Sequence, residues 1–266
     1  MCRVVRMKTV VLQSFRTFDV PTWISSSMAT VRQWAEMNGW SYEFMDDTFF
    51  GFAPAWVRTR CAANKYAVTD ICRLEWAQRK LAEGYQRVVW ADADMLVFVP
   101  GELRLADGSG HGFARELFLH VGENDVTTPI HGINNALMFF ETGDPVLAAY
   151  LEECYACLRT LPDGPVPRTA LGPALLLRFA GTRPLRAIER VGLFSQAIME
   201  SIAAGGGPLA NEYLRQSRLP PAAANLCHFL RNATAPQHRP VFDRLYDLAL
   251  QRLIQTQGAV LAAVTQ

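Results

Sequence analysis

Two acidic residues one position apart, Asp92 and Asp94, interrupt an apolar run that extends from Val88 to Phe98. An apolar run of this length is typical of a buried strand, and an unpaired carboxylate in a protein interior is unfavourable. We therefore expect the pair to emerge at the end of a strand and to meet a cation. Carboxylate oxygens are hard ligands that suit Mg²⁺ or Mn²⁺, and these ions often join protein carboxylates to the phosphates of a substrate.

Three further polar residues share one face of a helix expected from about residue 64 to residue 83. Tyr66, Asp70 and Arg73 stand at positions i, i+4 and i+7, which places an aromatic ring, a carboxylate and a guanidinium on the same side. That side adjoins the apolar stripe of the helix, so the charged groups can border a cleft. The alternative is an ordinary surface ion pair, which stabilises little. The acidic pair on the next strand favours a binding site.

The first hundred residues alternate between strand and helix patterns. Strands are expected at 9–13, 40–45 and 88–98, and helices around Met28–Ala35, capped by Gly39, and at 64–83. This order predicts the α/β fold class, with a mostly parallel central sheet flanked by helices. Ligands of such sheets bind beyond the carboxyl ends of the strands, where Gln13, Ser14 and Asp46 would join the acidic pair.

Beyond residue 100 the pattern is less regular. We expect a Gly-rich loop at 100–112, a short strand pair at 113–121, a strand at 136–140, a helix with an apolar stripe from Val146 to Leu158, and a turn-rich lid or acceptor loop at 162–173. Cys154 and Cys157 have the spacing of a redox or zinc motif. Because they fall inside the helix pattern, we expect them to be buried as small hydrophobic residues.

The composition sets limits on the class of protein. The chain has 266 residues, with 26 Lys and Arg, 25 Asp and Glu, and a formal net charge of +1. This balance does not indicate nucleic acid or an anionic membrane as a partner. No apolar run approaches the ~20 residues needed to span a bilayer, and Met1–Lys8 is not followed by a signal-peptide core. We expect a cytoplasmic protein without a transmembrane segment, with peripheral attachment to the inner face of the membrane as the alternative.

The segment Lys65–Arg73, followed by Gly84-Tyr85 and Asp92-Ala-Asp94, resembles the signature of GT-A glycosyltransferases. The nearest group is the family whose sugar-binding region contains the DXD motif, which also includes α-mannosyltransferases and glucosylating toxins. Further similar segments follow in the expected order: Ile133–Met138, Asp144-Pro145, Thr169–Pro173 and His228.

Some positions depart from the pattern of that family. Thr69 replaces the usual serine, and Ala170-Leu171 interrupts the Thr-Gly-Pro turn. The sequence distance from the helix to the acidic pair is longer than usual in that family. The segment Gly84–Asp94 is similar to the corresponding segment of other GT-A families. The subfamily, and with it the donor sugar and the stereochemistry, therefore stays open.

The resemblance implies a single GT-A (Rossmann-like) nucleotide-diphospho-sugar transferase domain over residues 1–266. Residues 1–100 would form the nucleotide-binding half, 101–235 the acceptor half, and 236–266 a C-terminal helix. The implied reaction is metal-dependent transfer of a sugar from a UDP- or GDP-sugar to a saccharide, a lipid-linked compound or another hydroxyl acceptor. In the nearest family the anomeric configuration is retained.

The resemblance also implies roles for individual residues. Asp92, Asp94 and His228 would bind Mn²⁺ or Mg²⁺. The catalytic set would be Asp92, Asp94 and Asn135. The donor would be bound by Gln13, Ser14, Asp46, Lys65, Asp70, Arg73, Asp92, Asn134 and Gly172. The ion would neutralise the charge that grows on the departing nucleoside diphosphate as the anomeric carbon becomes cation-like.

These assignments have structural and functional alternatives. His228 is equally well explained as a core histidine, Asn134-Asn135 as a strand cap, and Asp46-Asp47 as a solvated turn. A non-catalytic protein that binds nucleotide sugars or carbohydrate would carry the same residues. An Asp-nucleophile phosphohydrolase also places Asp-x-Asp after a strand, but that class usually has a small hydroxyl residue where this chain has Leu96.

Overall fold

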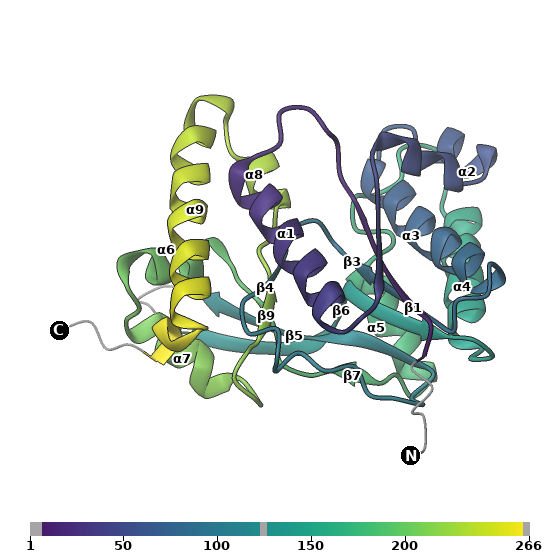
Figure 1. Ribbon diagram of the computed structural model, residues 1–266. Helices are drawn as coiled ribbons and strands as arrows, with labels where there is room; N and C mark the ends of the chain where they lie inside the picture. Colours follow the sequence, from purple (N-terminus) through teal and green to yellow (C-terminus); the bar gives the residue numbers. More distant parts are fainter. Residues whose placement is uncertain (1–6, 123–126, 263–266) are drawn as a thin grey trace, which may run out of the picture.

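The protein, seen in a computed structural model that describes residues 7–122 and 127–262, has an α/β fold with a six-stranded sheet flanked by helices (Figure 1). The strands are β1 (Thr9–Ser14), β2 (Ser41–Met45), β3 (Arg87–Ala91), β4 (Met95–Val97), β5 (His111–Val121), β6 (Thr127–Glu141), β7 (Ala187–Ile188), β8 (Val191–Leu193) and β9 (Ala223–Asn225). The helices are α1 (Thr22–Met37), α2 (Ala55–Arg60), α3 (Lys65–Ala82), α4 (Val146–Thr160), α5 (Pro173–Thr182), α6 (Gln196–Ala204), α7 (Pro208–Gln216), α8 (Phe229–Ala233) and α9 (Arg239–Thr256). Short 3₁₀ turns cover Asp47–Phe52, Pro236–His238 and Ala259–Ala262.

The large sheet has the strand order β2-β1-β3-β6-β5-β7. Strands β1, β2 and β3 are parallel, β6 runs antiparallel to both of its neighbours, and β5 is parallel to β7. Within this sheet β6 therefore opposes the other five strands, which confirms the prediction of a mostly parallel sheet. The carboxyl ends of β1, β2 and β3 meet at one edge.

The strand predicted from Val88 to Phe98 is wrong in its extent. The run divides into β3, in the large sheet, and β4, which pairs with β9 in a separate three-stranded sheet of order β4-β9-β8. The acidic pair occupies the turn between them, where the Met95 amide donates to the Asp92 carbonyl over 3.0 Å. The turn exists because two carboxylates cannot enter the apolar interior of either sheet.

The strand pair predicted at 113–121 is also wrong. These residues lie in one long strand, β5, which pairs with β6 along its length and has an irregularity between Phe113 and Ala114. The predicted strand at 136–140 is the buried second half of β6. The predicted helical stripe from Val146 to Leu158 is confirmed in α4.

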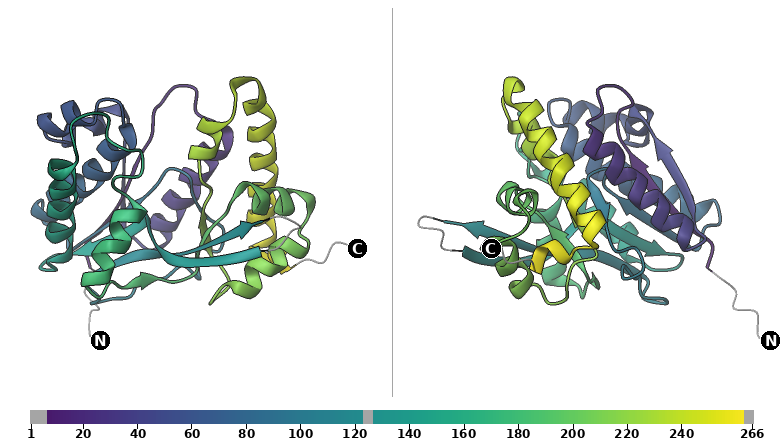
Figure 2. Two further views of the ribbon diagram at one scale, coloured as in Figure 1. Left: turned by 180° about the vertical axis from the view of Figure 1, so that it is seen from behind. Right: turned by 60° about the vertical axis from the view of Figure 1, so that its left-hand side comes forward.

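Alternating residues of the central strands supply two layers of the core. Val10 and Leu12 pack toward α3, α4 and α5, whereas Val11 packs against α1 on the other face. A third apolar cluster joins α1 to α6, α7 and α9, and Figure 2 shows α9 beside α6 at the end of the molecule opposite α2 and α4. Both faces of the large sheet are thus covered.

The C-terminal helix is shorter than the sequence predicts. Helix α9 ends at Thr256, and residues 263–266 of the predicted helix lie outside the described residues. Cys154 is buried inside α4 as predicted, whereas Cys157 is only partly buried and its thiol contacts the Ala170 carbonyl. Across the described part of the chain, no helix combines the length and the apolar character needed to cross a bilayer.

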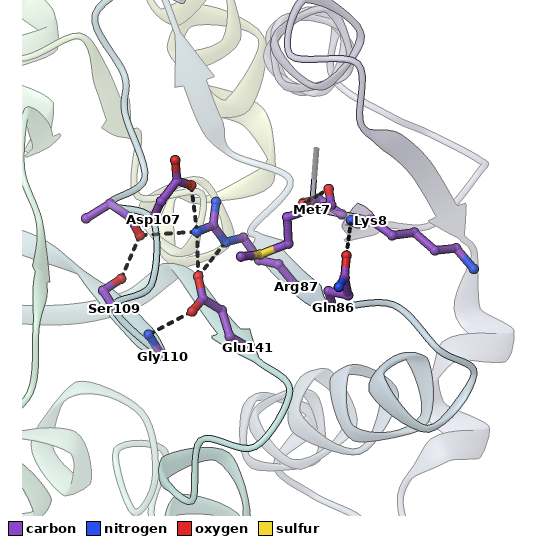
Figure 3. Close-up of polar contacts among 10 residues, drawn as sticks. Met7, Lys8, Gln86, Arg87, Asp107, Ser109, Gly110 and Glu141 are labelled. Atoms are coloured by element: carbon purple, nitrogen blue, oxygen red, sulfur yellow. Dashed lines mark hydrogen bonds and ion pairs between the residues drawn. The ribbon is translucent and has the colours of Figure 1, made fainter. Parts of the chain in front are cut away.

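A buried ion pair holds the start of β3, at the end of the strand opposite the acidic turn. Arg87 is 2 % exposed and its Nε donates to Glu141 Oε1 over 3.0 Å (Figure 3). Glu141 Oε2 accepts from the Gly110 amide over 2.9 Å, and the Arg87 guanidinium also reaches Asp107 at 3.1 Å. Because Arg87 and Glu141 face each other in register, this pair fixes β3 against β6.

We expect Arg87→Met to lower the free energy of unfolding by about 3–5 kcal/mol, because it leaves the Glu141 carboxylate buried without its cation. Urea denaturation followed by circular dichroism measures this. The control is Arg79→Met, which breaks an exposed pair with Glu83 and should change stability by less than about 1 kcal/mol. Equal losses in the two variants would contradict a structural role for the buried pair.

Candidate functional site

The candidate site begins where the carboxyl ends of β1 and β3 lie side by side. Gln13, which is fully buried near the end of β1, donates from Nε2 to the Asp92 carbonyl over 3.0 Å. Its Oε1 accepts from the Tyr42 hydroxyl of β2, also at 3.0 Å. Ser14 is the last residue of β1. Gln13 therefore ties three parallel strands to the acidic turn, and both of its polar groups are engaged by the protein.

Helix α3 carries the next layer of the site. The helix begins at Lys65 because the Asn64 side chain accepts from the Tyr66 and Ala67 amides at its first turn. One turn later Asp70 is buried, and Arg73 follows it on the same face. Tyr66, the third member of the predicted face, is 42 % exposed.

Arg73 is the centre of a polar network. Its guanidinium lies 2.8 Å from Asp70 Oδ1 and 3.3 Å from Asp92 Oδ1, and it donates to the Asn135 carbonyl over 2.9 Å. The Asn135 side chain donates to Asp70 Oδ1 over 3.0 Å, and the Trp90 indole donates to Asp92 Oδ1 over 2.6 Å. Asp70, Arg73, Asp92 and Asn135 are thus brought together from α3, β3 and β6.

Asp94 is held by the segment around His228, including Asn225, a residue that sequence reasoning did not single out. Asn225, the last residue of β9, donates to Asp94 Oδ1 over 2.8 Å. The backbone amide of His228 donates to Asp94 Oδ2 over 2.7 Å. No local sequence signal identifies Asn225, because its contact with Asp94 joins residues that lie 131 positions apart and depends on the pairing of β4 with β9.

The charges of this site are poorly balanced. Asp94 is 8 % exposed; burial, together with the charge of Asp92, raises its pKa to about 7. Burial also raises the pKa of Asp70 to about 6, although Arg73 opposes the shift. Arg73 pairs with Asp70 and Asp92, whereas Asp94 forms no ion pair among the described residues. A cation near Asp92 and Asp94 would relieve this excess of negative charge.

His228 lies in an aromatic environment beside the acidic turn. Its ring is 5.2 Å from the Phe15 ring and 5.8 Å from the Trp23 ring. Burial and then the nearby Arg16 lower the pKa of the imidazole to about 4, so the ring is neutral at pH 7. Within the described residues its Nε2 is buried and has no hydrogen-bond partner. A neutral imidazole with a free nitrogen is the form that binds metal ions.

A divalent ion at the acidic turn would need ligands from a substrate as well as from the protein. In the described part of the chain, no three His, Cys, Asp or Glu side chains are arranged to hold a metal among themselves, so the predicted set of Asp92, Asp94 and His228 is not preassembled. Mg²⁺ is commonly bound by one or two carboxylates together with substrate phosphates. The unbalanced carboxylates and the unpartnered His228 nitrogen suit such an ion.

The other predicted residues divide into two groups. Gly172 borders the network: its φ of +74° is unfavourable for other residues, and an added Cβ would lie 3.3 Å from Asp70 Oδ2. Asn134 instead donates to Glu116 and accepts from the Ala136 amide. Asp46 caps the 3₁₀ turn that follows β2 by accepting from Thr48, and Lys65 is exposed beside the Phe50 ring. The described contacts do not join these last three residues to the acidic turn.

Two hollows lie elsewhere on the described surface. One is bordered by Arg115, Glu189 and Arg218, and the other by Asp144 and neighbouring residues of α4. Neither of these hollows reaches the acidic turn. The candidate site is therefore defined by its buried charge and hydrogen bonds.

Similarity to known proteins is found among solved structures. No family model matches the chain, and no curated protein matches its sequence. Among solved structures, the chain is similar to one described as the crystal structure of a glycosyltransferase involved in the glycosylation of the major capsid of PBCV-1. The identity is 12 %, the TM-score is 0.44, and the match covers 89 % of this chain and 99 % of that chain. A likeness at this score supports no functional conclusion.

We expect Arg73→Met to lower the free energy of unfolding by about 3–5 kcal/mol, because Asp70 and Asp92 would lose their shared cation. The double variant Arg73→Met/Asp70→Asn removes one of the two stranded carboxylates and should recover part of the loss. Urea denaturation of the wild type, both single variants and the double variant measures the coupling. Additive losses in the double variant would contradict the network.

The raised carboxyl pKa values also predict a pH dependence. With a chelator present to remove metal ions, the folded protein keeps protons on Asp70 and Asp94 at pH values where the unfolded chain has lost them. These two groups therefore make the free energy of unfolding fall as the pH rises from about 4 to 7. His228 acts in the opposite sense because its pKa is lowered. The Asp94→Asn variant lacks the carboxyl group with a pKa of about 7. The difference between its stability curve and that of the wild type therefore gives the contribution of Asp94. Parallel stability curves for the two proteins between pH 5 and 8 would contradict the burial of Asp94.

Proposed function

We propose that this protein is a glycosyltransferase that moves a sugar from a nucleoside-diphosphate sugar to a hydroxyl acceptor with the help of Mn²⁺ or Mg²⁺. The observation that carries the proposal is the acidic turn at the carboxyl end of β3. Two carboxylates lie there at the edge where ligands of α/β sheets bind; Arg73 pairs with Asp92, and Asp94 has no ion pair among the described residues. A divalent ion with a diphosphate supplies the missing partner.

Asp92 and Asp94 would hold the ion, with His228 available as a further ligand. When bound, such an ion neutralises charge that develops on the departing nucleoside diphosphate. The protein's own contribution is to fix the two carboxylates. Arg73 and the Trp90 indole hold Asp92, and the segment after β9 holds Asp94.

Asp70, Asn135 and Gly172 are the proposed contacts of the donor sugar. Asp70 uses Oδ1 for Arg73 and Asn135, which leaves Oδ2 toward Gly172. A side chain at position 172 would crowd this oxygen, since its Cβ would lie 3.3 Å away. Arg73 is already engaged by the protein, so we propose that it positions Asp70 and Asp92 and does not bind the sugar directly.

The acceptor is proposed from the motif resemblance alone. A saccharide or lipid-linked compound would bind through residues 101–235, and transfer would retain the anomeric configuration. Strand β5, the first half of β6 and the loop at 161–172 belong to this part of the chain.

The test measures sugar release from UDP- and GDP-sugars, with and without Mn²⁺ and candidate acceptors. The wild type should release sugar only with the ion, and Asp94→Asn should lower kcat by about 10²–10³-fold because the developing charge loses its stabilisation. The control is Glu36→Gln, which changes an exposed carboxylate of α1 and should retain full activity. Undiminished activity of Asp94→Asn would overturn the mechanism, whereas metal-dependent binding without release would identify a non-catalytic binding protein.

A further inference from the structure

The segment Asn225–His228 lies in direct contact with the acidic turn, because Asn225 and His228 both donate hydrogen bonds to Asp94. Asn225 ends β9, the central strand of the small sheet, where it pairs with Met95 of β4 and Leu193 of β8. Met95 immediately follows Asp94 in the chain. The small sheet therefore fixes the position of the Asn225 backbone relative to Asp94.

The Asn225 side chain is committed on both of its polar atoms. Nδ2 donates to Asp94 Oδ1 over 2.8 Å, and Oδ1 accepts from the Cys227 amide over 3.0 Å. The residue is 8 % exposed. An amide that is buried and fully partnered by the protein is not free to contact a substrate. Its effect on any reaction must pass through Asp94.

The same amide stabilises the turn that supplies the second hydrogen bond to Asp94. Cys227 has a φ of +54°, which is unfavourable for a residue with a Cβ. Its backbone amide donates the hydrogen bond to Asn225 Oδ1. This turn brings the His228 amide to 2.7 Å from Asp94 Oδ2 and the Leu226 amide to 3.0 Å from the Asp94 carbonyl. Both carboxylate oxygens of Asp94 thus depend on Asn225, one directly and one through the turn.

We infer that Asn225 is a positioning residue that fixes the carboxylate of Asp94 for a divalent ion. The inference rests on the proposed function. Residues that hydrogen-bond metal ligands orient them, and loss of such a residue typically weakens metal affinity by about 10–100-fold. The hydrogen bond from His228 to Asp94 is donated by the backbone amide, so it does not depend on whether the imidazole is a metal ligand.

The experiment titrates Mn²⁺ into the full-length protein in the presence of UDP or GDP and follows free Mn²⁺ by electron paramagnetic resonance. Asn225→Ala and Asn225→Leu should each weaken Mn²⁺ affinity by about 10–100-fold. Leucine has a similar volume to asparagine, so the second variant keeps β9 packed if the first fails to fold. The control is Val57→Ala, which truncates a buried side chain of α2 and should lower stability without changing Mn²⁺ affinity.

The outcomes separate this inference from the proposed function. Wild-type binding of Mn²⁺ with UDP or GDP supports the function, and a selective loss in the Asn225 variants supports the positioning role. Wild-type affinity in a folded Asn225 variant would overturn the positioning role alone. An equal loss in Val57→Ala would also overturn it, because the effect would then follow general stability. Absence of Mn²⁺ binding in the wild type would overturn both.

Discussion

The structure depends on how three carboxylates, Asp70, Asp92 and Asp94, are accommodated at the edge of an apolar core. Buried carboxylates are tolerated only with partners, and each element around them provides one. Helix α3 supplies Arg73, β3 supplies the Trp90 indole, and the segment after β9 supplies an amide side chain and a backbone N–H. The remaining excess of negative charge is the property from which we infer a bound cation.

This accommodation explains the division between the two sheets. The chain leaves the large sheet at Asp92, turns, and joins the small sheet at Met95, so the acidic residues belong to neither interior. The large sheet positions Asp92 through Gln13 and helix α3 positions it through Arg73, whereas the small sheet positions Asp94 through Asn225. The acidic turn is therefore held from both sides. A shift of one sheet relative to the other would separate the two carboxylates.

Local patterns were sufficient to predict β1, α1, β2 and α3, and the place of the acidic pair at a strand end, but not α2. Helical spacing also placed Asp70 and Arg73 on one face, because residues four and three positions apart meet on a helix. The division of the 88–98 run was missed because an apolar run does not show which sheet each half will join. The contact of Asn225 with Asp94 was missed because it depends on strand pairing between distant segments. The proposed role of Arg73 also changed, since its partners can be assigned only in three dimensions.

The most direct test of the central claim, that the acidic turn binds a divalent ion together with a nucleoside diphosphate, is a thermal-shift panel. The wild type and Asp94→Asn are compared with UDP, GDP and their sugars, each with and without Mn²⁺. A ligand at about 100 times its Kd should raise the wild-type Tm by roughly 5–10 °C only when Mn²⁺ is present, and this rise should be lost in Asp94→Asn. No shift with any compound in folded wild-type protein, or the same shift in Asp94→Asn, would contradict the claim.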